Sequence, residues 1–164
     1  MWPLNVHAQT ELEGLTFKDA LQACIEAVGS GDLKSAASLF QLLEVTFGAE
    51  DEYLTEEVQR RILPLKGLAE LGAGQFQQAA DTLDSLEESY PQALQQNAAL
   101  LYGWARAHKG AGNNSKAREA LNRYLIQVGG TLEAFLAQLE KADLFFADGM
   151  LEEGLAEIDA FTSS

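Results

Sequence analysis

Apolar residues recur three and four positions apart along most of the chain, which is the spacing of helices with one buried side. These helical stretches come in pairs, and one glycine separates the two members of each pair. The glycines are Gly31, Gly74, Gly112 and Gly149, at intervals of 43, 38 and 37 residues. The sustained alternation of apolar and polar residues that marks β-strands is absent from the sequence. The pattern therefore predicts an all-α fold of about four antiparallel helical hairpins.

The residues that follow each glycine repeat by size. A small residue stands five positions after the glycine, and large residues stand nine and twelve positions after it. The small residues are Ala36, Ala79, Ala117 and Gly154, and the large ones are Phe40, Leu83, Leu121 and Ile158, followed by Leu43, Leu86, Tyr124 and Phe161. A small residue lets two helices approach closely, and large residues fill the space between neighbouring hairpins.

Polar caps and helix-breaking residues predict where the helices begin and end. Thr16 with Asp19 three positions later suits a helix start, because a side-chain oxygen can accept a free amide hydrogen there and an acid suits the positive helix end. Later helices are expected to begin near Asp32, Asn114 and Thr131, and to end or turn at Gly48, Pro91, Gly129 and Gly130. The predicted helix over residues 51–71 contains Pro64, whose ring and missing amide hydrogen favour a kink or an interruption.

These hairpins resemble the tetratricopeptide repeat, a family of helical hairpins of about 34 residues. In the second hairpin, Gly67, Ala79, Leu83 and Pro91 stand at the positions of the repeat's Gly, Ala, Phe and Pro. The resemblance implies a right-handed superhelix of repeats at about 17–48, 52–91, 95–130 and 131–161. Residues 1–15 would then form an N-terminal strap or a short helix ahead of a single domain over residues 16–164.

The resemblance also implies a concave groove that is lined by the first helix of each hairpin. The family's inward positions correspond to Leu21, Ile25, Val28, Leu68, Leu71, Tyr102, Arg106, Lys109, Leu139, Asp143 and Phe146. Such a groove is mostly apolar with a basic spot, which favours an apolar segment of a partner protein, bound as a helix or an extended strand with an acidic residue beside Arg106. The alternative for Leu21, Ile25, Leu68 and Leu71 is simple packing between helices.

Charge narrows the classes of partner. The 164 residues include 25 acidic and 11 basic side chains, for a net charge of −14, which disfavours binding to nucleic acid or to anionic membranes. With 47% hydrophobic residues, one cysteine and neither a long apolar run nor a leader-like segment, we expect a folded cytoplasmic protein. The charge is uneven, because residues 97–130 carry a local +4 and residues 131–164 a local −7.

Residues with the potential for chemistry are scattered. His7 and His108 are far apart, Cys24 stands among alanines, and the GAGNNSK segment at residues 110–116 lacks the order of a phosphate-binding loop. We therefore expect no metal, no cofactor and no enzyme activity.

The sequence thus predicts a protein-binding adaptor or chaperone. The alternative is a structural subunit whose repeats mediate homo-oligomerisation or assembly of a larger complex. The last helical stretch carries Leu151, Leu155, Ile158 and Phe161, and any uncovered side of it would offer an apolar patch to a homodimer or a partner.

Overall fold

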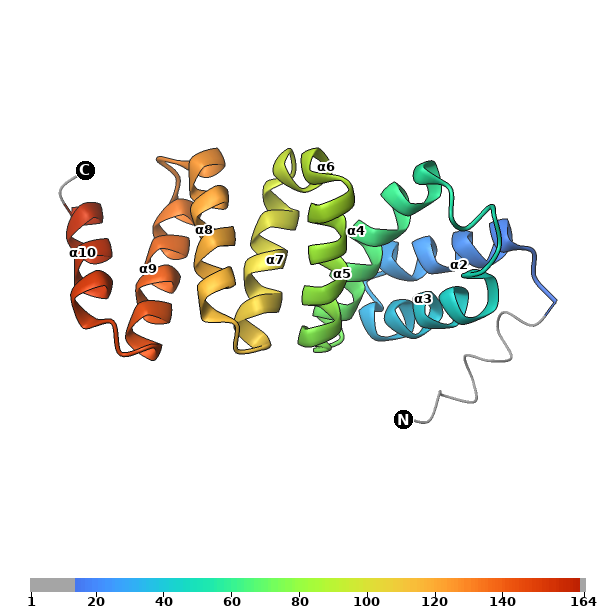
Figure 1. The fold of residues 1–164 in the computed structure, drawn as a ribbon, viewed down its shortest axis with the longest axis horizontal. Coiled ribbons are helices and arrows are strands. Elements are labelled where there is room, and N and C mark those ends of the chain that lie inside the picture. The colour runs from blue at the N-terminus through green and yellow to red at the C-terminus, as the bar shows by residue number, and fades with distance from the viewer. Residues whose placement is uncertain (1–13, 163–164) are drawn as a thin grey trace. The chain divides into compact units, whose positions relative to one another are not determined.

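The computed structural model of the chain describes residues 14–162, which form nine α-helices joined by turns and contain no strand (Figure 1). The helices are α2 (Phe17–Gly29), α3 (Leu33–Phe47), α4 (Glu56–Gly72), α5 (Phe76–Ser89), α6 (Pro91–Gln95), α7 (Ala98–Gly110), α8 (Asn114–Val128), α9 (Leu132–Ala147) and α10 (Leu151–Thr162). The prediction of an all-α fold is confirmed. The predicted N-terminal strap at residues 1–15 lies, except for its last two residues, outside the described part of the chain.

Two compact units make up the chain. The first extends to Leu86 and the second begins at Glu87. The first contains α2, α3, α4 and most of α5, and the second contains α6 to α10. The expected domain over residues 16–164 therefore comprises two units. Within each unit, consecutive helices pack side by side, with α2 on α3, α7 on α8, α8 on α9 and α9 on α10.

The four repeated glycines form the turns of the hairpins, as the sequence predicts. Gly31, Gly74, Gly112 and Gly149 all have φ between +74° and +80°. A residue with a Cβ atom rarely adopts this left-handed conformation, whereas glycine does so without a steric cost. These turns therefore set the place where each chain segment reverses direction.

The small and large positions after the glycine are buried as predicted in the first three hairpins. Ala36, Ala79, Ala117 and Gly154 are buried, and Phe40, Leu83 and Leu121 have at most 1% of their surface exposed. Ile158 is half-buried, and the side chain of Phe161 lies outside the described residues. In the second hairpin, a Cβ atom on Gly67 would lie 2.8 Å from Cγ of Leu83, so the backbone of α4 approaches this leucine directly.

The helix starts follow the predicted caps, with one shift. Thr16 accepts a hydrogen bond from the amide of Asp19 (3.3 Å), and Asp32 accepts one from the amide of Ser35 (3.1 Å). Thr131 likewise caps α9. For α8, however, the N-cap is Asn113, and the predicted cap Asn114 is the first helical residue.

Of the two outcomes expected at Pro64, an interruption of the helix is wrong. Helix α4 begins at Glu56 and runs through Pro64 to Gly72. A proline removes one helical hydrogen bond, but burial of Ile62 and Ala69 on the same helix offsets that loss. The preceding segment forms turns instead of helix, and Tyr53 anchors it with its ring 6.1 Å from the ring of Phe17.

A polar contact joins the last two hairpins of the second unit. Arg118 of α8 donates to Asp148, which follows α9, and to the main-chain carbonyl of Leu144 (3.1 Å). Its guanidinium carbon also lies 4.5 Å from the centre of the Phe145 ring. Asn114 donates a further hydrogen bond to Asp148 (2.6 Å). The turn between α9 and α10 is therefore attached to α8.

Candidate functional site

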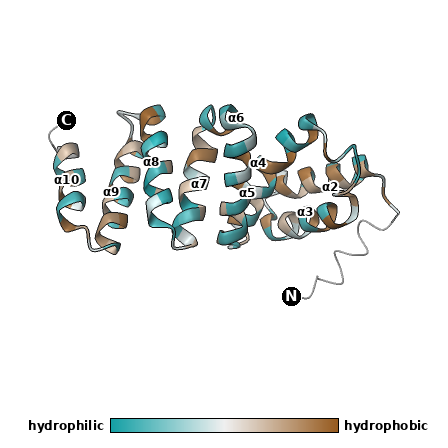
Figure 2. Cartoon of the chain, viewed as in Figure 1, coloured by the Kyte–Doolittle hydropathy of each residue, from teal (hydrophilic) through white to brown (hydrophobic). Residues whose placement is uncertain are grey.

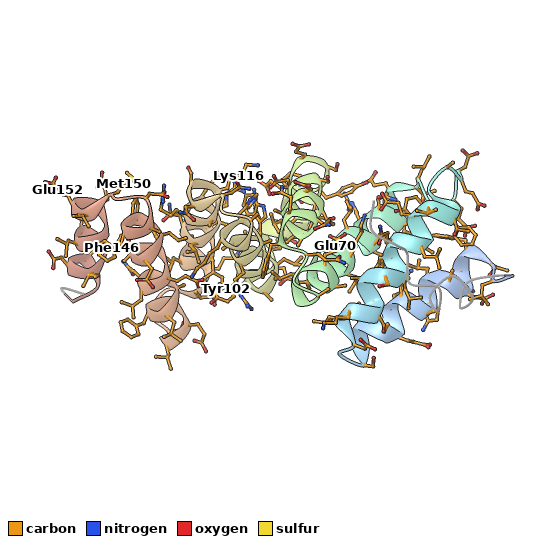
Figure 3. All side chains as sticks on the ribbon, turned by 90° about the horizontal axis from the view of Figure 1, so that it is seen from below. Glu70, Tyr102, Lys116, Phe146, Met150 and Glu152 are labelled. Carbon is orange, nitrogen blue, oxygen red and sulfur yellow. The ribbon has the colours of Figure 1, made fainter. Side chains whose placement is uncertain are left out.

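Helix α7 presents a narrow polar strip, because most of its side chains are buried. Tyr102, Arg106 and Lys109 are spaced four and three residues apart, which places them on one side of the helix. Tyr102 is half-buried, whereas Arg106 and Lys109 are exposed. Figure 3 shows Tyr102 and Lys116 on opposite sides of the α7–α8 hairpin. The predicted groove residues of α7 therefore share one accessible side.

A glutamate of α9 holds this strip against the next hairpin. The Tyr102 hydroxyl donates a hydrogen bond to Oε2 of Glu140 (2.9 Å), and Nζ of Lys109 donates to Oε1 (2.8 Å). Burial, followed by the bond to Glu140, raises the pKa of Tyr102. Arg106, by contrast, is exposed and forms no ion pair with any of the described residues.

Three leucines form an exposed stripe along α9. Leu132, Leu136 and Leu139 are spaced four and three residues apart, and they are 69%, 55% and 37% exposed. Asp143, one turn further along, is exposed as well. Figure 2 shows α9 as more hydrophobic than its neighbour α8. Exposed large apolar side chains at such spacing are typical of a surface that another protein covers.

The prediction from sequence contained Leu139 and Asp143 but missed Leu132 and Leu136. The same spacing of three and four continues toward the start of α9, and this was the signal that could have found them. Phe146, the third predicted residue of α9, has a different role. It is half-buried and packs on Gly154 of α10, where a Cβ atom would lie 2.6 Å from its Cδ1 atom.

The flanks of the leucine stripe face different helices. Glu140 binds side chains of α7, whereas Phe146 packs on α10. At about 100° per residue, these two positions lie on opposite sides of the line through Leu132, Leu136 and Leu139. The stripe therefore has α7 along one flank and α10 along the other.

Helix α10 exposes two more leucines, among acidic residues. Leu151 is 62% and Leu155 56% exposed, and Glu152 and Glu153 in the first turn are exposed beside them. No basic residue occurs in α10. Five of the ten exposed large hydrophobic residues in the described part of the chain thus lie on the α9–α10 hairpin.

The first unit uses its predicted groove residues differently. Leu21 is 6% exposed and belongs to the core, and Ile25 and Val28 pack against that core. Leu21 is therefore no accessible groove residue, which favours the alternative of packing between helices. Leu68 and Leu71 on α4 are half-buried.

A polar cavity of about 250 Å³ lies between α3, α4 and α5. It is lined by Ala37, Gln41, Glu44, Lys66, Glu70, Gln75, Gln78, Asp81 and Thr82. Nζ of Lys66 lies 2.5 Å from Glu44 and 4.0 Å from Glu70, and the Thr82 hydroxyl donates a hydrogen bond to Glu70 (2.7 Å). The three helices are thus joined by polar contacts as well as by their apolar core.

Burial acts on two of the charged groups that line this cavity, Glu70 and Lys66. Glu70 is only 6% exposed, and the loss of water raises the pKa of its carboxyl group. For Lys66, burial is the largest influence and would lower the pKa, but the hydrogen bond to Glu44 and the negative charges of Glu44 and Glu70 together outweigh it, so the pKa is raised. Lys66 therefore keeps its charge, whereas Glu70 is ionised at a cost.

The cysteine and the described histidine are buried. Cys24 is fully buried, and burial raises the pKa of its thiol to about 12. His108 is buried, and His7 lies outside the described residues. Within residues 14–162, no group of three or more histidine, cysteine, aspartate or glutamate side chains is placed to hold a metal ion. None of the helices described is both long and apolar enough to cross a membrane.

No model of a known protein family matches the chain. A search of curated proteins finds no match either. A function is therefore inferred from the surface that α7 and α9 form.

Proposed function

We propose that the chain is a cytoplasmic protein-binding module of the tetratricopeptide type, which works as an adaptor or a chaperone. In this proposal, its hairpins follow one another in a right-handed superhelix. The partner binds at the inner surface, which we define as Tyr102, Arg106, Lys109, Leu132, Leu136, Leu139 and Asp143. The observation that carries the proposal is the exposed leucine stripe of α9 beside the polar strip of α7.

Burial of the leucine stripe by a partner would contribute favourable free energy to binding. Burying a fully exposed leucine side chain contributes about 1.5 to 3 kcal/mol, so three partly exposed ones contribute on the order of 3 kcal/mol together. Association costs at least that much in lost translational and rotational freedom. The partner must therefore also use the ring of Tyr102 and the charge of Arg106.

These polar contacts define the chemistry of the partner segment. The segment has apolar side chains at the spacing of a helix or of alternate strand positions, and an acidic residue that meets Arg106. Glu140 already neutralises Lys109, so Arg106 is the charge that selects the acid. Asp143 at the far end of the stripe disfavours a second acidic residue there.

The test is a capture experiment with matched variants. Leu136→Glu places a charge in the middle of the stripe, whereas Ile126→Glu makes the same kind of change at a residue of α8 that is 84% exposed. A protein that the wild type and Ile126→Glu retain, but that Leu136→Glu loses, supports the proposal. Far-ultraviolet circular dichroism checks that both variants keep their helices. Equal capture by Leu136→Glu and the wild type would show that the stripe is not the binding surface.

The second candidate function is that of a structural subunit that assembles through its repeats. The leucines of α10 favour it, because they extend the exposed apolar area beyond the inner surface. Light scattering separates the two functions, since self-assembly changes the mass of the purified chain with concentration.

A further inference from the structure

The second helix of a hairpin contacts the next hairpin through the residues two and six positions after the turn glycine. In α3 the first of these is Leu33, and a Cβ atom on Gly72 at the end of α4 would lie 2.8 Å from its Cβ atom. In α8 they are Asn114 and Arg118, and both donate hydrogen bonds to Asp148 at the end of α9. These two positions therefore mark the side of a second helix that the following hairpin covers.

Each of these junctions also contains a pair of opposite charges. Nζ of Lys66 on α4 lies 2.5 Å from Glu44 on α3, and Arg118 on α8 binds Asp148. The following hairpin thus combines a close contact at its first helix with a charge opposite to that of the second helix it covers.

Helix α10 carries leucines at the same two positions. Leu151 and Leu155 follow Gly149 by two and six residues, and they are 62% and 56% exposed. Figure 1 shows α10 beside α9 as the last helix of its unit. Arrays of stacked hairpins normally end in a polar outer face, so two exposed leucines at this place indicate a surface that another helix covers. We call Leu151 and Leu155 the end surface.

The charges near the end surface are all negative. The charged residues of α10 are Glu152, Glu153, Glu157 and Asp159. Gly154 and Glu157 contact α9, through Phe146 and Lys141. At about 100° per residue, Glu152 and Asp159 lie on the opposite side of α10, where they border Leu155. A helix that covers the end surface therefore meets acids along its edge.

We propose that the end surface docks the first helix of a helical hairpin that belongs to another protein and carries lysine or arginine. The docked helix packs on Leu151 and Leu155, as the end of α4 packs on Leu33. Its basic residues face Glu152 and Asp159, so the junction has opposite charges like the two junctions within the chain. The end surface lies outside the inner surface, and the inference goes beyond the proposed function.

A second copy of the chain fits the end surface poorly. Helix α2 has no hairpin before it among the described residues, and its exposed Asp19 and Glu26 stand where α4 buries Ile62 and Ala69. Stacking α2 of one copy on α10 of another places acids against acids. Pairing α10 with α10 does the same. Repulsion disfavours both arrangements, whereas a basic helix replaces it by attraction.

Two synthetic amphipathic helices test the proposal. One peptide has leucine and alanine on its apolar side and only lysine on its polar side, and the other has glutamate in place of every lysine. Fluorescence anisotropy with the purified full-length chain at moderate salt should show binding of the lysine peptide. The glutamate peptide should bind about tenfold more weakly or less.

Matched variants locate the bound peptide. Leu151→Ser with Leu155→Ser removes the apolar contact at α10, and Leu132→Ser with Leu136→Ser removes two leucines from α9. Neither pair alters the net charge of −14, so any general attraction of lysine remains. The α10 pair should weaken binding of the lysine peptide about tenfold or more, and the α9 pair should bind it like the wild type. Circular dichroism checks that both variants keep their helices.

Four results would overturn the inference. They are a wild type that does not bind the lysine peptide, equal binding of the two peptides, loss of binding in the α9 pair instead of the α10 pair, and self-association of the purified wild type that the α10 pair abolishes. The last result would show that a second copy covers the end surface. Capture at the inner surface, which Leu136→Glu tests, is unaffected by any of the four.

Discussion

Gly154 offers a sharp test of how closely α9 and α10 pack. A methyl group at this position would lie 2.6 Å from Cδ1 and 2.8 Å from Cζ of Phe146. Carbon atoms that are not bonded normally stay about 3.5 to 4.0 Å apart. Gly154→Ala therefore forces the aromatic ring or the backbone of α10 to move.

Two opposing contributions determine how Gly154→Ala changes the free energy of unfolding. Alanine is a better helix former than glycine by about 1 kcal/mol. Inserting a methyl group into a tightly packed contact costs about 1 to 3 kcal/mol. We expect the cost to win because a ring gives way less easily than the end of a flexible chain, so the variant should be about 1 kcal/mol less stable. The matched control is Gly29→Ala at the end of α2, where nothing lies within 4 Å, and it should be about 0.5 kcal/mol more stable.

Urea unfolding followed by circular dichroism measures both changes. A loss of about 1 kcal/mol shifts the midpoint down by about 0.5 M. In a double-mutant cycle with Phe146→Leu, the cost of Gly154→Ala should shrink, since the smaller side chain vacates the space that the methyl group needs. A Gly154→Ala variant as stable as the Gly29→Ala control, or a cycle without coupling, would contradict this account of the contact.

Three further predictions concern charged and reactive groups. Burial raises the pKa of Glu70, so its protonated form stabilises the fold below the ordinary glutamate pKa of 4.5, and this stabilisation is lost as pH rises through the raised value. The free energy of unfolding of Glu70→Gln should therefore increase relative to that of the wild type between about pH 4 and 7. The Cys24 thiol, with a pKa of about 12, should react with a thiol reagent at pH 8 only after unfolding, which absorbance during a denaturant titration reports. Arg118→Ala should cost about 1 to 2 kcal/mol at neutral pH. Because Arg118 lowers the pKa of Asp148, that penalty should shrink as pH falls through the lowered value, and a constant penalty would argue against the ion pair.

The local parts of the fold could be predicted because they depend on neighbours in sequence. A turn at Gly31 or Gly149 needs only a residue that tolerates positive φ, and a cap at Thr16 needs only an oxygen near the first amides. The uninterrupted α4 at Pro64 could not be predicted in this way, because the packing that offsets the lost hydrogen bond comes from the rest of the first unit.

The accessible surface was harder to predict than the helices. Periodicity marks Leu21 and Leu139 alike as apolar positions on a first helix, yet Leu21 is in the core and Leu139 is exposed. The difference arises from which neighbouring helix covers each residue, which the spacing does not encode. Glu140 illustrates the same point, since its binding of Tyr102 and Lys109 joins residues more than thirty positions apart.

The attachment of Asp148 to α8 couples the unfolding of neighbouring hairpins in the second unit. Arg118 and Asn114 both bind this residue, so the α9–α10 hairpin cannot detach without breaking contacts of the preceding hairpin. Neighbouring hairpins that share such contacts unfold cooperatively. The amide hydrogens of α9 should accordingly exchange with solvent at rates close to those of α8, so the leucine stripe is lost only when the preceding hairpin unfolds with it.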